Sequence, residues 1–271
     1  MSTENYFALF CRSNHEESLL DIRFKEDFIV LWKKFFGEAE LPIAFYYTNE
    51  EGHAELVKPN TIARRCVVAA LSFVRKGNGL CFDAESIGCS GGQLCLGFRE
   101  TLEPDDKYFL SCGIPGKVEG ERYKKTPEIA ATWLKLMPSF KAPARFIVFK
   151  RWDSLNESDE PDVVIFFACP DVLSGLHSLA NFDETEPNVV FTPMASGCIS
   201  IVLYPFLEKD SARPRAVIGL FDVSARPDVP ENTLSFSVPM RKFERMVRNM
   251  EESFLTTNSW KALQKRIQGA P

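Results

Sequence analysis

Apolar residues recur at helical spacing near the start of the chain. From Leu20 to Phe35 they follow each other at steps of four, four, three and four. That spacing places them on one face of a helix, so it predicts an amphipathic helix over residues 17–36 that ends at Gly37.

Farther along, short apolar runs alternate with longer segments of helical pattern. The uninterrupted apolar run over residues 163–168 is typical of a strand that is buried on both faces. Strands are predicted at 41–47, 80–82, 145–149, 163–168, 189–191, 216–221 and 234–238, and helices at 66–74, 126–137, 171–180, from about 240 and at 259–267. This alternation predicts an α/β fold of the mixed α+β kind.

The chain contains no long linker, so the pattern predicts one compact body. In this interpretation residues 1–40 are an N-terminal helical segment and residues 41–257 are a single α/β domain. Residues 258–271 then form a C-terminal helix and tail.

Two stretches, residues 66–98 and 169–206, share a pattern of helix, strand, glycine-cysteine turn and second apolar segment. In both, the step from a phenylalanine to a cysteine is seven residues, from Phe82 to Cys89 and from Phe191 to Cys198. The shared step predicts two related helix–strand–turn–helix units, with the two phenylalanines buried at equivalent positions. The two units are expected to form lobes with a cleft between them.

Charge and composition narrow the class of protein. The net charge of −5 gives no general attraction to nucleic acid or to anionic membranes. The first residues lack a basic stretch followed by an apolar run, and no apolar segment approaches the length of a membrane span. Eight cysteines in such a chain point to reduced thiols, so a cytoplasmic location is expected.

The cysteines carry the first candidate site. No Cys-x-x-Cys occurs, which argues against zinc ribbons, thioredoxin-type redox pairs and ferredoxin-type cluster runs. Scattered thiolates can still converge on a metal. Cys66, Cys89 and Cys198 each come at an expected helix start or glycine-rich turn. They are candidate ligands of an iron–sulfur cluster or a related metal site. The simpler alternative is that they are small buried apolar residues, which is the interpretation favoured for Cys81, Cys95 and Cys112.

The second candidate site would bind a small anion. The turn Ser90, Gly91 and Gly92 could present backbone amides to an anion, although it lacks the ending of a P-loop. Arg122 and Lys124 lie in a charge-dense loop that is either a solvated surface or a contact to a carboxylate or phosphate.

Arg226 completes this set of candidate ligand-binding residues. It follows a strand end, where α/β sheets commonly bind ligands, and it could equally be a structural tie between the two lobes. Only three histidines occur, which argues against a catalytic site built on histidine.

These patterns leave three functions open. The first is a binding protein for a small molecule or anion, with a cleft between two lobes. The alternative is a protein with a cysteine-ligated iron–sulfur cluster or metal. An enzyme with a cysteine nucleophile is the third, and the sequence offers no evident partner base for it.

Several of these motifs together resemble domain-of-unknown-function family 169, over about residues 41–257. They are Arg65-Cys66, Gly88-Cys89-Ser90-Gly91-Gly92, Pro161-Asp162-Val163-Val164, Gly197-Cys198 and the stretch from Val238 to Glu244. The resemblance implies that cysteines matching Cys66, Cys89 and Cys198 recur in the family, whereas Cys169 does not belong to the pattern. It therefore favours three cysteine ligands over four, and it implies no established activity.

Overall fold

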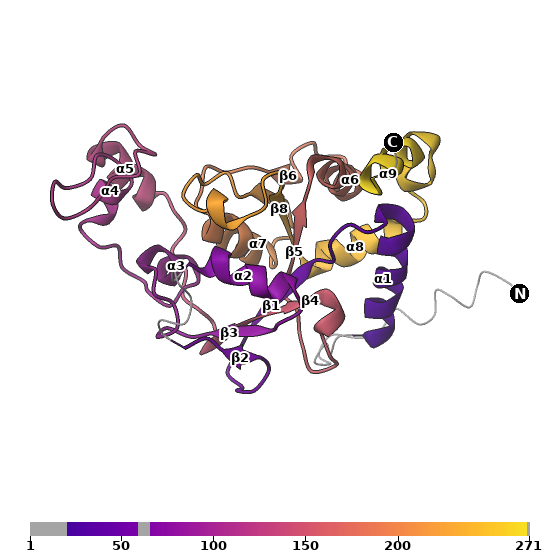
Figure 1. Ribbon diagram of the computed structural model, residues 1–271, viewed down its shortest axis with the longest axis horizontal. Helices are drawn as coiled ribbons and strands as arrows, with labels where there is room; N and C mark the ends of the chain where they lie inside the picture. Colours follow the sequence, from indigo (N-terminus) through magenta and orange to yellow (C-terminus); the bar gives the residue numbers. More distant parts are fainter. Residues whose placement is uncertain (1–20, 59–65, 270–271) are drawn as a thin grey trace, which may run out of the picture.

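The computed structural model describes residues 21–58 and 66–269, and these form one mixed α/β body around a single sheet (Figure 1). Within the described residues the sheet has eight strands, in the order β2-β3-β4-β1-β5-β8-β7-β6. The strands are β1 (Ile43–Thr48), β2 (Glu55–Leu56), β3 (Leu80–Phe82), β4 (Phe146–Arg151), β5 (Val163–Ala168), β6 (Val190–Phe191), β7 (Ala216–Gly219) and β8 (Leu234–Pro239).

The centre of the sheet is an antiparallel pair of strands, β1 and β5, that is buried on both faces. All six residues of β5 are buried, as the uninterrupted apolar run predicts. On β1, Ile43 and Phe45 point to one core while Ala44 points to the other, because successive side chains of a strand alternate between faces. Helices therefore cover both sides of the sheet.

One face of the sheet packs against short helices. These are α2 (Val67–Arg75), α3 (Ser90–Cys95), η4 (Ile199–Leu203) and α7 (Tyr204–Glu208). The opposite face packs against longer helices, namely α1 (Ile22–Phe36), α6 (Pro170–Asn181), α8 (Met240–Asn249) and α9 (Asn258–Ile267). On this second face Trp32, Trp152, Phe166 and Phe243 form a network of aromatic rings in contact.

A long excursion leaves the body between α3 and β4. We call residues 99–142 the excursion; it contains α4 (Asp106–Phe109) and α5 (Pro127–Lys135). Figure 1 shows α4 and α5 at one end of the molecule and α1, α8 and α9 at the other. The excursion thus lies beside the short-helix face, next to α3.

The mixed α/β class and the single body are confirmed. The helix expected over 17–36 begins at Ile22, and the first residues of that prediction lie outside the described residues. The two-residue strand β2 and the short helix α4 were not expected, because their sequences are polar and carry no periodicity.

The arrangement of the strands does not support the predicted superposition of residues 66–98 on residues 169–206. Phe82 lies on β3 between two neighbouring strands and is 1% exposed. Phe191 lies on the edge strand β6 and is only half-buried. The equal burial expected of the two phenylalanines is therefore wrong, because an edge strand has a neighbour on one side alone.

The strands nevertheless follow a regular order from both edges of the sheet. Read inward from one edge the order is β2, β3, β4, β1, and read inward from the other it is β6, β7, β8, β5. In each series the two outermost strands are parallel and all other pairs are antiparallel. Helix α2 connects one parallel pair, and η4 with α7 connects the other.

In the described part of the chain, no helix combines the length and the apolar character that a membrane crossing requires.

Candidate functional site

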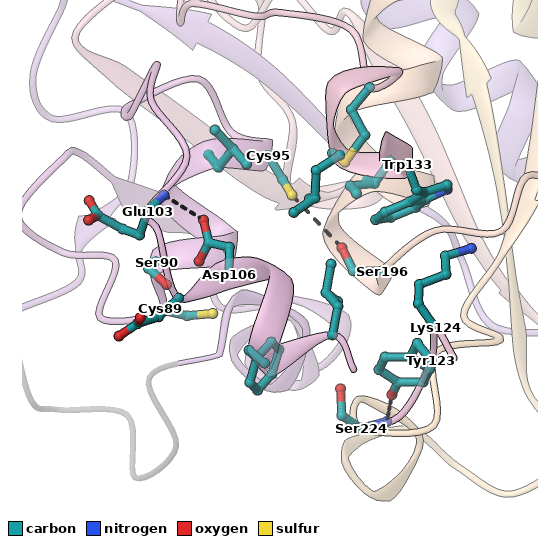
Figure 2. A pocket seen from close by; sticks show the side chains of 18 of the residues that line it. Cys89, Ser90, Cys95, Glu103, Asp106, Tyr123, Lys124, Trp133, Ser196 and Ser224 are labelled. Carbon is teal, nitrogen blue, oxygen red and sulfur yellow. Dashed lines mark hydrogen bonds between the residues drawn. The ribbon is translucent and has the colours of Figure 1, made fainter. Parts of the chain in front are cut away.

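A cavity of about 810 Å³ lies between α3, the excursion and the segment that leads into η4 (Figure 2). We call it the pocket. Its apolar wall includes Leu94, Phe109, Leu110, Val118, Trp133, Leu134, Met137, Met194, Ala195 and Ile199. Its polar lining includes Cys89, Ser90, Cys95, Arg99, Glu103, Asp105, Asp106, Lys117, Tyr123, Lys124, Ser196, Asp222 and Ser224. A cavity of this size, with apolar walls and a few polar groups, is typical of small-molecule sites.

Two of the three cations at the pocket are neutralised by carboxylates. Lys117 pairs with Asp105 at 2.7 Å, and Arg99 pairs with Asp106 at 3.2 Å. Within the described residues Lys124 has no carboxylate partner, and its ammonium lies 4.8 Å from the centre of the Trp133 ring. Lys124 is therefore the cation whose charge is available to a bound anion.

Arg99 also brings an unused donor to the pocket. Its Nε atom is buried and has no hydrogen-bond partner among the described residues. A buried donor without an acceptor costs about 1–3 kcal/mol, so an acceptor supplied by a ligand would be favourable there.

Asp222 ties the excursion to the body at the rim of the pocket. It is 8% exposed, and its carboxylate accepts hydrogen bonds from the Tyr123 hydroxyl at 2.8 Å and from the Gly197 amide at 3.0 Å. The hydroxyl of Ser224 donates to it at 2.7 Å. One carboxylate thus holds together three parts of the chain that surround the pocket.

The three candidate metal ligands each lie at the start of a helix. Cys66 and Cys89 directly precede α2 and α3, and Cys198 directly precedes η4 within a helical stretch that begins at Gly197. The Cys89 sulfur accepts a hydrogen bond from the Gly92 amide at 3.4 Å. All three thus lie at a helix start, as the sequence predicts, and a glycine stands directly before Cys89 and before Cys198.

The starts of these helices also touch one another. A methyl group placed on Gly197 would lie 2.8 Å from Val68, and one placed on Gly92 would lie 3.6 Å from Val67. Both valines belong to the first turn of α2. The turns that carry Cys89 and Cys198 therefore pack against the helix that follows Cys66.

The thiols interact electrostatically. Burial raises the pKa of the Cys198 thiol well above its usual value, and Cys95, Cys66 and Cys89 raise it further. Burial also raises the pKa of Cys66, opposed by the backbone amides of Ala69 and Val68, and it raises the pKa of Cys95 to about 12. As free thiols these groups are protonated at neutral pH. Among residues 21–58 and 66–269, no three side chains of His, Cys, Asp or Glu are placed to hold a metal ion.

The structure brings together three of the six residues predicted to bind a ligand. Ser90, Gly91 and Lys124 all line the pocket. Lys124 comes from the excursion, whereas Ser90 and Gly91 begin α3, so the loop and the turn that the sequence singled out face one cavity.

The other three lie elsewhere. Gly92 is buried in the first turn of α3, and Arg122 is exposed, with a left-handed backbone φ of 57°. The Arg226 guanidinium donates to the carbonyl oxygens of Thr233 and Glu231, which makes it a tie within its own loop. These contacts are local, so they do not form the tie between two lobes that was the structural alternative.

Sequence reasoning missed several residues at the pocket. Trp133 and Tyr123 lie on the excursion, and Cys95, expected as a simple apolar residue, lines the pocket and lies 3.8 Å from the Ser196 hydroxyl. The apolar face of the helix at 126–137 was the available signal for Trp133. Tyr123 and Ser196 carry no local pattern that distinguishes them.

These features define a mixed α/β protein with a large, mostly apolar pocket beside a group of cysteines. The chain belongs to domain-of-unknown-function family 169, described as an uncharacterised ArCR, whose family model matches residues 34–249. The resemblance seen in the motifs is thereby confirmed. Comparisons with curated proteins and with solved structures found no match.

Proposed function

We propose that this protein binds a small, largely apolar molecule that carries an anionic group. The observation that carries the proposal is the pocket of about 810 Å³, in which Lys124 is a cation without a carboxylate partner among residues 21–58 and 66–269. The volume suits a small organic ligand, because such sites commonly measure roughly 300–1,000 Å³.

The walls indicate how the ligand lies. Trp133 offers a flat ring, and the neighbouring Lys124 ammonium places a positive charge beside it. An aromatic or unsaturated carboxylate would stack on the ring and place its charge at the ammonium. The free Nε of Arg99 supplies a second donor for a ligand oxygen.

The test compares ligands that differ in charge alone. Indole-3-acetate and its neutral amide, indole-3-acetamide, serve as probes in thermal-shift and calorimetric titrations at fixed pH. We expect indole-3-acetate to bind more tightly than indole-3-acetamide. Lys124→Met should lower the affinity for indole-3-acetate about 10- to 100-fold, since a hydrogen bond to a charged group contributes about 1.5–3 kcal/mol.

The control is Lys125→Met, because Lys125 is the adjacent lysine, is exposed and does not line the pocket. It should bind both probes as the unmodified protein does. Equal losses in the two variants, or no preference for the carboxylate, would show that the pocket does not use Lys124 in this way. Binding should also persist in Cys66→Ser, because Cys66 is outside the pocket lining.

A further inference from the structure

We infer that Cys66, Cys89 and Cys198 together ligate an iron–sulfur cluster at the wall of the pocket. This inference does not rest on the proposed ligand; it rests on where the fold places the three thiols. Thiolates are the ligands that iron–sulfur clusters use in proteins.

The first observation is that the three cysteines all lie at the start of a short helix on the same face of the sheet. Cys66 and Cys89 are extended residues directly before α2 and α3, and Cys198 lies in the first turn of the helical stretch that begins at Gly197 and continues as η4. They come from segments up to 132 residues apart in the chain, from Cys66 to Cys198. Local sequence preference alone would not bring three such turns to one place.

The second observation is that the strand order relates two of them. Cys66 opens the helical connection between the parallel strands β2 and β3. Cys198 opens the connection between the parallel strands β6 and β7, which hold the matching places at the other edge. The two cysteines therefore have corresponding positions about the centre of the sheet, and Cys89 joins them through the packing of Gly92 on α2.

The third observation concerns the surroundings of the thiols. Cys198 is 8% exposed, and its thiol makes no hydrogen bond to a described residue. On either side of Cys198, Ser196 and Ile199 line the pocket, and Cys89 lines it directly.

No three potential ligands in the described chain converge on one metal ion, so the inference is of a cluster and not of a single ion. A cluster contains several iron and sulfide atoms, so its ligands stand farther apart than those of one ion. Cys95 is not assigned as a ligand, because it lies within α3 and its sulfur is next to the Ser196 hydroxyl.

Three protein ligands would leave one iron of a cubane cluster without a protein ligand. Because Cys89 is both a ligand and part of the pocket lining, the cluster would border the space where a small molecule binds. The pocket and the thiols would then be neighbouring parts of one functional region.

The test is anaerobic reconstitution of the full chain with ferrous iron and sulfide, followed by desalting and measurement of bound iron, acid-labile sulfide and visible absorption. The unmodified protein should retain both elements stoichiometrically. Cys66→Ser, Cys89→Ser and Cys198→Ser should each lose them to near background. Cys198→Ala is measured as well, because a buried serine hydroxyl could itself disturb folding.

The matched control is Cys169→Ser. Cys169 is exposed and also stands immediately before a helix, α6, but α6 packs on the opposite face of the sheet. This variant should retain iron and sulfide fully. Circular dichroism of each variant before reconstitution shows whether it is folded, and Cys89→Ser is informative in any case because Cys89 is exposed.

Three results would overturn the inference: an unmodified protein that retains no sulfide, a Cys89→Ser protein that retains as much iron as the unmodified one, or stoichiometric zinc binding with no iron–sulfide retention. The probe titrations are separate from this result. If the protein binds indole-3-acetate but takes up no iron, the cluster inference is wrong and the proposed ligand site stands. If it retains iron and sulfide but does not bind indole-3-acetate, the proposed ligand site is wrong and the cluster inference stands.

Discussion

The Asp159 carboxylate is buried and is surrounded by hydrogen-bond donors. It is 0% exposed, and both of its oxygens accept hydrogen bonds from the Lys150 ammonium at 2.8 Å. The Tyr46 hydroxyl and the Asn156 amide also donate to it. This network ties β1 and β4 to the loop that precedes β5.

Removing the charge of Asp159 should strongly destabilise the protein. Asp159→Asn leaves the buried Lys150 ammonium without its counter-charge, and breaking such a pair typically costs about 3–5 kcal/mol in the free energy of unfolding. Urea unfolding followed by circular dichroism measures the change. The matched control is Asp153→Asn, which breaks the more exposed pair with Arg151 and should cost less than about 1 kcal/mol. Similar losses in both variants would mean that burial does not decide the effect.

The same carboxylate makes stability depend on acid pH. Burial alone would raise the pKa of Asp159, but hydrogen bonds from Lys150 and Tyr46 outweigh it and hold the pKa below its usual value. The stabilisation is therefore complete above the pKa of the unfolded chain, about 3.9, and is lost as the pH falls through the lower folded-state value. In Asp159→Asn this part of the acid dependence should be absent, so its stability should fall less steeply below about pH 4.

At the scale of elements, the turns that carry Cys89 and Cys198 pack closely against the start of α2. Gly197 permits this because its missing side chain lets the turn of Cys198 lie against Val68 of α2. A methyl group there would be 2.8 Å from Val68 and 3.2 Å from Leu220, both too close for normal contact.

Gly197→Ala should therefore separate α2 from η4. We expect it to lower the free energy of unfolding by about 1–3 kcal/mol, as overpacking of a well-packed core does. Gly91→Ala is the comparison, since the nearest atom to its added methyl group would be 3.8 Å away. That variant should be neutral or slightly stabilised because alanine favours a helix. If both variants unfold at the same urea concentration, the contact with α2 is looser than the structure indicates.

At the scale of the whole molecule, the excursion 99–142 forms one side of the pocket while the sheet and its helices support the other. Its attachment includes the Tyr123 hydroxyl, which donates to Asp222 and accepts from the Ser224 amide, both at 2.8 Å. The backbone amide of Ala142 also donates to the Gly97 carbonyl, where the excursion returns to the body. The pocket therefore depends on how firmly the excursion is held.

Tyr123→Phe should loosen the excursion without unfolding the body. Each lost hydrogen bond contributes about 0.5–1.5 kcal/mol, so amide hydrogen exchange should become faster in α4 and α5 and stay unchanged in β5 and β8. Tyr108→Phe is the control, because Tyr108 lies in α4 and its hydroxyl has no hydrogen-bond partner in the described chain. Equal exchange in both variants would show that Tyr123 does not hold the excursion.

Most of the elements and the local setting of the cysteines could be predicted from the sequence. The apolar run from Val163 to Ala168 specified a strand buried on both faces, and Thr126 before Pro127 specified the start of α5. Cys66, Cys89 and Cys198 were recognisable as residues at helix starts. These features depend on neighbours within a few residues, so local periodicity and capping preferences reveal them.

The pairing of the strands and the set of side chains that share the pocket could not be predicted from local patterns. Phe191 has the local pattern of Phe82, yet it lies on an edge strand, because strand order depends on contacts between distant segments. Ser90, Lys124 and Asp222 meet at one cavity for the same reason, and Arg226 is instead engaged by the backbone of its own loop. Local patterns identify residues that can bind, but the packing of separate elements determines which of them face the same space.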